Sequence, residues 1–389
     1  MPLKLYNTAS MKTEKFKELQ KGEVKIYVCG VTPYDTTHLG HAFTYVFFDT
    51  LVRYLKFKGF KVTYTQNVTD IDDDIIRRSR EEGKDWRELG KYWTDRYLKD
   101  MESLNVSMPD YYVRATESID KIIEMVSALI HKKFAYLGNG NVYFDVSKFP
   151  AYGKLSHFND KQMRILLKER GGDPDDKNKR NPLDFVLWLG HKEGEPCWDA
   201  SFGRGRPGWH IECSAMINQY LGDRIDIHGG GRDLAFPHHE SEIAQSESFT
   251  GKRPFVGYFM HTGMVMYMGE KMAKSLGNLI MVSELLKSHS PNSIRWLLLS
   301  HHYRRVWEYA DEEMEKADGH VKKADMLMKK GSIKGKLNKE LVYEFERIMD
   351  EDMNTPAALE FVYSIISEGK EEATAQYLLE VLGFARPQR

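Results

Sequence analysis

The chain opens with short β-rich runs that alternate with a run of helical periodicity. Residues 24–28 alternate in part between apolar and polar side chains, which predicts a strand, and residues 59–66 predict a second one. Between them, apolar side chains at helical spacing predict a helix over 42–56. A strand, a loop with glycine and proline, and a helix form the opening of a Rossmann-like unit, in which a ligand lies where the strand ends. We therefore predict an α/β fold.

The pattern changes along the rest of the chain. Residues 119–130 have the apolar spacing of an amphipathic helix, and residues 141–146 and 224–228 predict strands. Charged segments with glycine and proline between about 150 and 206 interrupt the pattern and indicate an insertion. The predicted segments are 1–115 and 204–258 for the two halves of a nucleotide-binding domain, 116–203 for the insertion and 311–389 for a helical bundle.

One helix start in the bundle has a clear signature. Residues 352–356 end in Thr355-Pro356, and an apolar stripe follows. Because proline suits the first turn of a helix and threonine suits the N-cap, we predict that Thr355 caps this helix.

The composition narrows the class of protein. A length of 389 residues suggests two or three domains, and 41% hydrophobic with 29% charged residues is typical of a globular protein. The net charge of −1 means that contact with nucleic acid needs a local basic patch. Three cysteines argue against a disulfide framework and for a reducing compartment. No apolar run resembles a membrane span or a signal peptide, so we predict a cytoplasmic protein without membrane contact.

The first candidate site is His38-Leu39-Gly40-His41, at the start of the predicted helix. His38 and His41 stand three residues apart and can face one side of the first turn. The helix N-terminus suits a phosphate chain, and Gly40 leaves space for a base or a ribose. On these residues alone, ordinary capping or core histidines are an equal alternative.

Two further loops carry candidate ligand contacts. Gly229, Gly230 and Gly231 follow a predicted strand and permit close approach of a ligand, with Asp233 able to bind a ribose hydroxyl. A glycine turn is the alternative. The polar loop 67–74 has oxygen ligands for calcium, but its spacing is not that of an EF-hand, so helix capping and ligand contact are the favoured interpretation.

Four residues form a candidate metal site. Cys29 ends the first strand, Cys213 lies farther on, and His238 and Glu242 share one face of a predicted helix. Two thiolates, an imidazole and a carboxylate can surround zinc. The ligands come from distant segments, unlike a paired C-x-x-C motif, so buried cysteines with a capping histidine remain the alternative. Two of the segments adjoin the predicted nucleotide site.

A sequence resemblance adds to this interpretation. Residues 269–278, with Lys271 and Lys274, resemble the KMSKS loop of class I aminoacyl-tRNA synthetases, and residues 38–41 resemble their HIGH motif. Within that class the chain resembles the cysteinyl-tRNA synthetase family from about residue 3 to about residue 310. The segments that carry this similarity are 27–30, 67–73, 206–216 and 227–240.

The resemblance implies a fold and an activity. The fold would be a Rossmann-like class I catalytic domain with an insertion, a stem-contact region over 259–310 and a C-terminal helical bundle. The activity would be ATP-dependent activation of L-cysteine, followed by transfer to tRNA(Cys) held mainly by its acceptor arm. The expected cofactors are one Zn²⁺ per chain and Mg²⁺ with ATP, and the working expectation for assembly is a monomer.

The resemblance also assigns residues. Zinc would be held by Cys29, Cys213, His238 and Glu242 and would bind the substrate thiolate directly. The cysteine pocket would include Gly30, Thr69 and Trp209. ATP would be bound by His38, Gly40, His41, Gly229, Gly230, Asp233 and Lys274. His38, His41, Lys271 and Lys274 would be the catalytic groups, because they can stabilise charge on the phosphates.

Some features depart from the family pattern. Ala273 replaces the first serine of the KMSKS pattern, from which we expect intact or slower activation, and we take Cys197 as incidental. The chain ends with the predicted bundle, so we expect tRNA to be held by its acceptor arm and elbow.

Two other functions were weighed. The cysteine ligase of mycothiol biosynthesis, which transfers cysteine to the amine of glucosaminyl-inositol, is the alternative, and residues 32–42 resemble it more closely. Glu242 and residues 181–185 and 269–271 favour the synthetase. An inactive zinc-binding paralogue is disfavoured because every proposed ligand is present.

Overall fold

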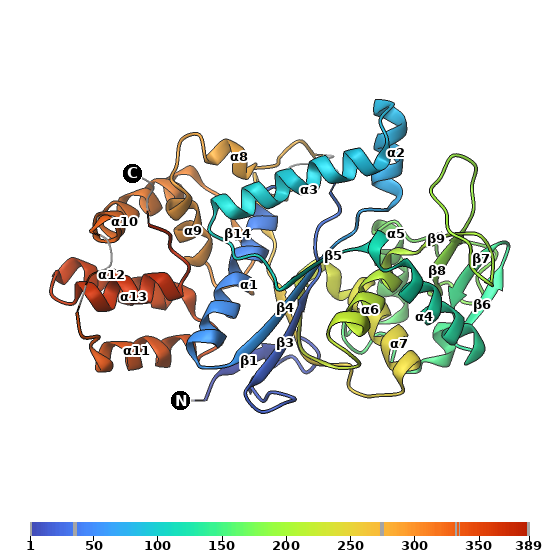
Figure 1. Ribbon diagram of the computed structural model, residues 1–389, viewed down its shortest axis with the longest axis horizontal. Coiled ribbons are helices and arrows are strands. Elements are labelled where there is room, and N and C mark those ends of the chain that lie inside the picture. Colours follow the sequence, from blue (N-terminus) through green and yellow to red (C-terminus); the bar gives the residue numbers. More distant parts are fainter. Residues whose placement is uncertain (1, 34–36, 273–275, 331–332, 334, 387–389) are drawn as a thin grey trace.

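A parallel five-stranded sheet forms the centre of the molecule in this computed structural model (Figure 1). The structure describes residues 2–33, 37–272, 276–330, 333 and 335–386. The strand order is β11-β10-β3-β4-β5, and the pairings in this sheet are parallel. The strands are β3 (Glu23–Val28), β4 (Lys61–Val68), β5 (Tyr111–Arg114), β10 (Ile225–Gly231) and β11 (Val256–Thr262). The predicted α/β class is confirmed.

Helix α1 (Leu39–Phe57) connects β3 to β4 and is buried along most of its length. It begins three residues before the predicted start because His38 is its N-cap, with a side chain that accepts a hydrogen bond from the Gly40 N–H. After β4 come α2 (Asp73–Glu82) and α3 (Trp86–Ser103). The expected strand–loop–helix unit is therefore present and sets α1 against the sheet.

Strand β10 is longer than the predicted strand over 224–228, and its last residues exclude the alternative of a glycine turn. It does not end at His228 but continues through Gly231, and Gly229 to Gly231 pair with residues 260–262 of β11. A Cβ atom on Gly229 would lie 2.2 Å from the Phe48 ring of α1. Glycine is required there because helix α1 packs directly on the strand.

The insertion forms a separate sheet. Its strands have the order β6-β7-β8-β9 and pair antiparallel. They are β6 (Ala135–Gly138), β7 (Asn141–Phe144), β8 (Phe185–Gly190) and β9 (Gly205–Pro207), with α4 (Ile119–His131) and α5 (Asp160–Glu169) beside them. Strand β9 belongs to this sheet although it lies beyond residue 203, the predicted end of the insertion. Strand pairing by itself does not define a domain, and the predicted domain boundaries stay a prediction. The chain then returns through α6 (Trp209–Tyr220), the short helix η3 (Arg232–Ala235) and α7 (His238–Thr250).

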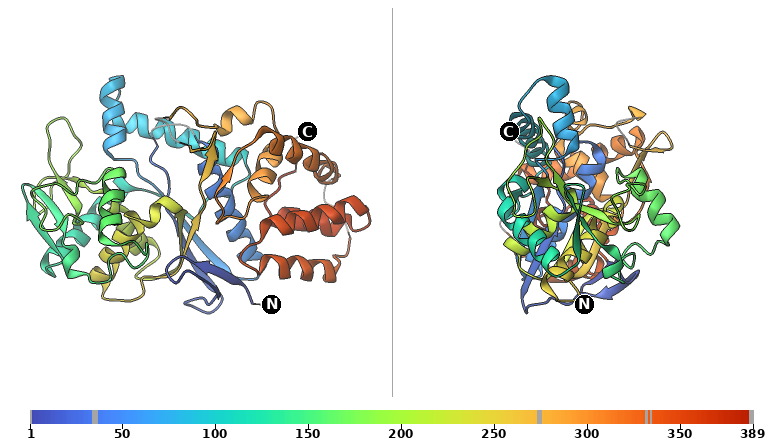
Figure 2. Two further views of the ribbon diagram at one scale, coloured as in Figure 1. Left: turned by 180° about the vertical axis from the view of Figure 1, so that it is seen from behind. Right: turned by 90° about the vertical axis from the view of Figure 1, so that its right-hand side faces the viewer.

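The helices at the C-terminal end pack on the opposite side from the insertion (Figures 1 and 2). The elements there are β12 (Val265–Tyr267), β13 (Glu270–Lys271), α8 (Val282–Leu285), α9 (Pro291–Leu299), β14 (Trp307–Glu308), α10 (Asp311–Lys329), α11 (Lys339–Met349), α12 (Thr355–Glu368) and α13 (Glu372–Val381). The prediction for the N-cap of α12 was wrong by one residue. Asn354 is the cap, and its side chain accepts a hydrogen bond from the Ala357 N–H.

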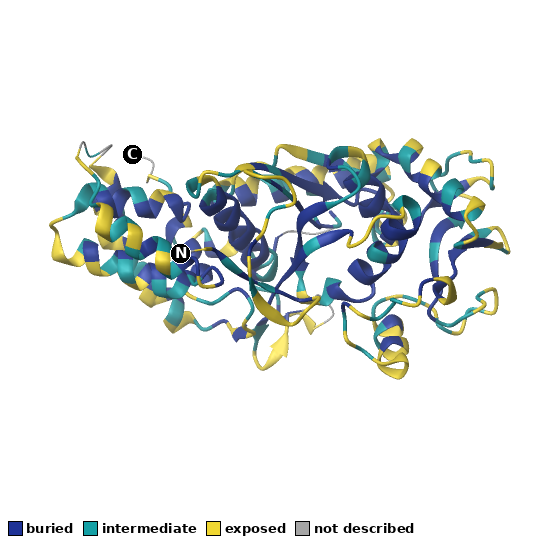
Figure 3. Cartoon of the chain, turned by 90° about the horizontal axis from the view of Figure 1, so that it is seen from below, coloured by how far each residue is buried: buried dark blue, intermediate teal, exposed yellow. Residues whose placement is uncertain are grey.

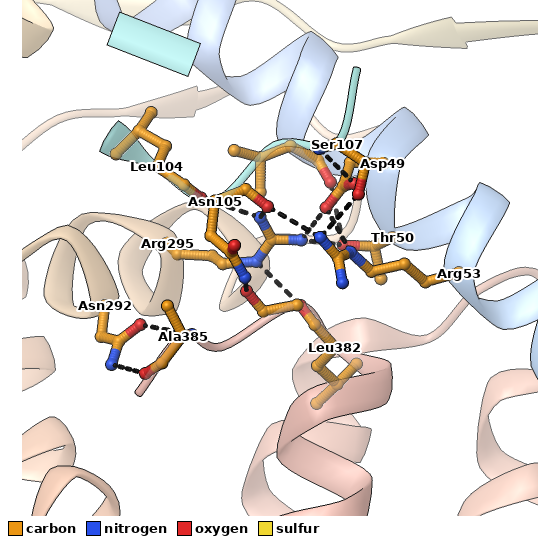
Figure 4. Close-up of polar contacts among 12 residues, drawn as sticks. Asp49, Thr50, Arg53, Leu104, Asn105, Ser107, Asn292, Arg295, Leu382 and Ala385 are labelled. Carbon is orange, nitrogen blue, oxygen red and sulfur yellow. Dashed lines mark hydrogen bonds and ion pairs between the residues drawn. The ribbon is translucent and has the colours of Figure 1, made fainter. Parts of the chain in front are cut away.

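One hydrophobic core extends from the central sheet through α1 into the bundle, whereas the insertion shares a second core with α6 and α7 (Figure 3). A buried polar cluster reinforces the first core (Figure 4). Arg295 of α9 donates to the backbone oxygens of Leu104 and Leu382 and to the carboxylate of Asp49 on α1. The guanidinium group of α9 therefore joins the end of α3, the end of the bundle and helix α1. Over the residues that the structure describes, no helix is both long and apolar enough to cross a membrane.

Candidate active site

A cavity of about 950 Å³ lies between the carboxyl ends of β3 and β10 and the insertion. In parallel α/β sheets this edge is where ligands bind. Its lining includes Cys29, His38, His41, Trp209, Asp233 and Lys271. Residues from every predicted motif therefore contribute to one cavity.

The N-terminus of α1 forms one end of the cavity. The rings of His38 and His41 stack with centroids 3.7 Å apart, and both line the cavity with Gly40. A Cβ atom on Gly40 would lie 2.9 Å from the His38 ring, so glycine allows His38 to fold back as the cap. Burial and the neighbouring His38 lower the pKa of His41 well below its ordinary value. The His38 and His41 rings thus stand at the positive end of the helix dipole, which suits an anion.

Lys271 and Asp233 lie on the other side of this end. The Lys271 Nζ is 3.5 Å from an Asp233 carboxylate oxygen, and both residues line the cavity. Lys274, the second lysine of the predicted loop, lies outside the described residues. Gly229 and Gly230, which were predicted to bind ATP, are not part of the described lining, whereas the neighbouring Gly231 is. Gly229 packs on Phe48 instead.

Four buried side chains, of which Cys29 lines the cavity, converge at one point. The ligand atoms of Cys29, Cys213, His238 and Glu242 all lie within 4.8 Å of one another. The two sulfurs are 3.9 Å apart, and His238 Nε2 is 3.1 Å from Glu242 Oε1. Tetrahedral zinc with Zn–S bonds of about 2.3 Å requires two sulfurs roughly 3.8 Å apart. The donor set and its spacing therefore fit zinc.

Burial favours the neutral forms of the cysteine and histidine side chains in this cluster, and a bound cation would stabilise the thiolates. Burial raises the pKa of the Cys29 and Cys213 thiols, with the nearby Glu242 carboxylate adding to the effect. Burial also lowers the pKa of His238 well below its ordinary value, so its imidazole is neutral, the form in which histidine binds a metal. A divalent ion would compensate the charge of two thiolates and a carboxylate in this buried place.

Three more histidines contact the four ligands or one another, and the sequence did not identify them as site residues. His228 Nε2 is 2.8 Å from the other oxygen of Glu242, His239 Nε2 is 3.3 Å from Cys29 Sγ, and His261 Nε2 is 2.9 Å from His239 Nδ1. Cys29, His228, His239 and Glu242 also lie within 4.8 Å of one another. We favour the set with two sulfurs for zinc, since its members are the softer donors and the other histidines orient them. The repeated histidines in 228–239 were the available signal.

Trp209, Gly30 and Thr69 differ in how they reach the cavity. The Trp209 ring stacks on the His238 ring with centroids 4.3 Å apart, and 38% of the residue is exposed. The Gly30 N–H donates to the Asn67 side-chain oxygen at 2.8 Å, and a Cβ atom on Gly30 would collide with the Asn67 backbone at 1.6 Å. Thr69 is buried behind them, where its hydroxyl accepts from the Asn67 amide at 3.3 Å. Trp209 and Gly30 therefore form the wall beside the ligand cluster, and Thr69 supports it.

The insertion supplies the remaining wall, which the sequence did not indicate. Arg170, Gly171, Gly172, Asp176 and Lys179 line the cavity from that side. Their positions depend on the return of a separate sheet to the catalytic domain, so no local pattern could identify them.

Comparisons with known proteins agree with this arrangement. A family model described as the tRNA synthetases class I (C) catalytic domain matches residues 15–319. The chain is 44% identical to a cysteine--tRNA ligase of Thermococcus onnurineus, covering 98% of this chain and 82% of the relative. It is 46% identical to a cysteine--tRNA ligase of Methanococcus maripaludis, covering 93% and 79%. The structure of Mycobacterium tuberculosis methionyl-tRNA synthetase in complex with methionyl-adenylate has a TM-score of 0.65 at 15% identity, covering 92% of this chain and 89% of that chain, so it supports the fold.

Proposed function

Because the chain belongs to the cysteine--tRNA ligase family of class I tRNA synthetases, we propose that it activates L-cysteine with ATP and transfers the cysteinyl group to tRNA(Cys). One observation carries the proposal: a zinc-compatible cluster of two thiols, an imidazole and a carboxylate reaches, through Cys29, the cavity that the α1 histidines and Lys271 also line. An amino acid with a thiol and a nucleotide with a triphosphate would each find matching groups there.

Activation would need alignment and charge stabilisation. The cysteine carboxylate attacks the α-phosphorus of ATP, a P–O bond to the leaving pyrophosphate breaks, and cysteinyl-adenylate forms. A carboxylate is already ionised at neutral pH, so no general base is required. His38, His41 and Lys271 would donate hydrogen bonds to the phosphate oxygens as their charge shifts, with Lys274 as a further donor and Mg²⁺ bound to the ATP. Asp233 would hold the ribose, and Gly40 and Gly231, which line the cavity, would leave room for the nucleotide.

In the transfer step, a hydroxyl of the 3′-terminal ribose of tRNA(Cys) attacks the acyl carbon of the adenylate. The bond between that carbon and the phosphate oxygen breaks, AMP leaves, and the hydroxyl proton is released to solvent. We propose that the acceptor arm provides the main tRNA contact and that the chain acts as a monomer.

Selection of cysteine would depend on Cys29, Cys213, His238 and Glu242 as the ligands of one zinc ion per chain. Zinc supplies a soft Lewis acid that binds a thiolate far better than an alcohol, a distinction that packing alone makes poorly for side chains of similar size. Trp209 and Gly30 would shape the pocket beside that ion, with Thr69 holding the Gly30–Asn67 contact in place.

The test separates the two acceptors considered from the sequence. Zinc-loaded protein is given ATP and labelled cysteine with either tRNA(Cys) transcript or glucosaminyl-inositol. The relatives described above are cysteine--tRNA ligases, which favours the tRNA. Labelled cysteinyl-tRNA is the expected product. Condensation with the sugar amine instead would overturn the choice of acceptor, and no adenylate with either acceptor would overturn the activity.

A further inference from the structure

A stretch of the insertion, residues 152–170, holds the chain that carries the active-site groups. Near its start, the Tyr152 hydroxyl lies 3.1 Å from the Ser241 hydroxyl, and the Ser156 N–H donates to the Glu240 carboxylate at 2.9 Å. Both partners belong to α7. At its end, Arg170 reaches η3. The insertion thus forms hydrogen bonds with η3 and with α7 at separate points.

Arg170 makes the contact with η3. It follows the last residue of α5, and its guanidinium Nη1 donates to the backbone oxygen of Asp233 at 2.6 Å and also to that of Phe236. These carbonyls lie within and just after a four-residue 3₁₀ helix, where backbone oxygens lack partners in the helix itself. Charge-assisted hydrogen bonds of this kind are the strong ones in proteins.

Among the described residues, the side chain of Asp233 has no comparable anchor. Its contact to Lys271 is 3.5 Å long, and the two side chains are 40% and 53% exposed. An ion pair exposed to that degree contributes little and does not fix its partners. The position of the Asp233 carboxylate is therefore set by the η3 backbone, which Arg170 holds.

The metal end of the cavity has separate supports. His238 is in contact with His210, with their Nδ1 atoms 3.0 Å apart, and Glu242 is bonded to His228 at 2.8 Å. Glu240 ties α7 to the insertion without Arg170. Loss of the Arg170 contact would therefore displace η3 while the ligand cluster stays in place.

We propose that Arg170 is a positioning residue for the nucleotide step: from the insertion, it fixes the η3 backbone and so sets where the Asp233 carboxylate lies toward ATP. The inference rests on the proposed function, since it assigns the partner of Asp233 as the nucleotide. It predicts that loss of Arg170 affects ATP and spares cysteine.

The experiment measures pyrophosphate exchange into ATP by zinc-loaded full-length protein. Arg170→Ala is compared with Arg170→Lys and with Arg164→Ala. Arg164 lies on the same helix, exposed and paired with Asp160 at 2.7 Å, so its removal tests for general damage to α5. Arg170→Ala should raise the KM for ATP by about tenfold or more, as expected for lost charge-assisted hydrogen bonds. The KM for cysteine and the zinc content should stay within about twofold, and Arg170→Lys should recover part of the loss.

Equal rises in both KM values, an unchanged KM for ATP, or the same effect in Arg164→Ala would overturn the inference. If Arg170→Ala does not fold, Arg170→Lys must still show the ATP-specific change. If the wild-type protein gives no exchange, the proposed function fails, and the inference is then judged separately by equilibrium dialysis with ATP. In that measurement Arg170→Ala must bind ATP more weakly than Arg164→Ala.

Discussion

Replacement of Arg295 by methionine tests how the bundle is joined to the catalytic domain. The guanidinium is fully buried and donates to the Leu104, Asn105 and Leu382 backbone oxygens at 3.0, 3.4 and 2.8 Å. It also donates to the Thr50 hydroxyl at 3.2 Å and to the Asp49 carboxylate. Methionine keeps the unbranched apolar part of the side chain and has no donors, so the change removes every one of these contacts.

The magnitude follows from what remains unpaired. Removal of one member of a buried ion pair costs about 3–5 kcal/mol. Asp49 retains the Arg53 side chain and the Ser107 N–H, each at 2.9 Å, so its charge keeps two partners. The loss should therefore lie at the lower end, about 3 kcal/mol. The double variant with Asp49→Asn should lose less than the sum of the single changes, because the two residues interact directly.

Urea unfolding followed by circular dichroism measures the change. Arg295→Met should lower the midpoint without a change in slope. Lys287→Met is the control, since Lys287 and its partner Glu284 are 67% and 63% exposed, and it should change stability by less than about 0.5 kcal/mol. A loss below about 1 kcal/mol for Arg295→Met, or full additivity with Asp49→Asn, would refute the proposed role of the cluster.

The same pair predicts a pH dependence. Burial by itself raises the pKa of Asp49, but Arg295 and Arg53 outweigh it and hold the pKa below the ordinary value of 3.8. A carboxyl group with a lowered pKa in the folded state adds stability above its unfolded pKa, and this is lost as the pH falls through the folded pKa. The stability difference between the wild type and Arg295→Met should therefore be full above about pH 4 and shrink below it, as urea midpoints across pH 2–6 will reveal.

Three further predictions concern the site. Cys213→Ser should lose bound zinc and cysteine activation together, as measured by metal analysis and pyrophosphate exchange. Cys197→Ser, which lies outside the cluster, should keep both. Retention of zinc by Cys213→Ser would remove Cys213 from the ligand set. Gly30→Ala should lower the free energy of unfolding by more than about 1 kcal/mol in thermal unfolding, since its Cβ would lie 1.6 Å from the Asn67 backbone oxygen. Gly319→Ala, with open space around it, should not destabilise the protein. Equal effects of the two changes would contradict this packing. His38→Asn keeps a capping side chain but not the ring, so the rate of exchange should fall roughly 100-fold while stability changes little, and an unaltered rate would exclude His38 from catalysis.

The sequence predicted the parts of the fold that depend on neighbours along the chain. Strand β3 and helix α1 follow from a β-rich run and an apolar stripe, and the family resemblance is supported by relatives over nearly the whole chain. The predicted length of β10 was wrong because Gly229 is required by its contact with Phe48. That residue is distant in sequence, and only the packing of α1 on the sheet brings the two together.

In the candidate site, too, residue types could be predicted from the sequence, whereas contacts between distant segments could not. The four predicted ligands could be chosen as residue types that suit zinc, and the structure brings their ligand atoms together, while metal binding itself stays a prediction. His228, His239 and Arg170 were missed as site residues because each acts through a contact with another segment. Such contacts depend on the tertiary arrangement and leave no spacing pattern in the sequence.

The most direct test of the account compares cysteine with serine in pyrophosphate exchange by zinc-loaded and zinc-free protein. If a metal held by Cys29, Cys213, His238 and Glu242 selects the thiolate, kcat/KM should favour cysteine by at least about a thousandfold. That preference should vanish with chelation and return with added zinc. Full cysteine activity in zinc-free protein, or serine activity within about tenfold of that of cysteine, would contradict the claim that a metal–sulfur bond chooses the substrate.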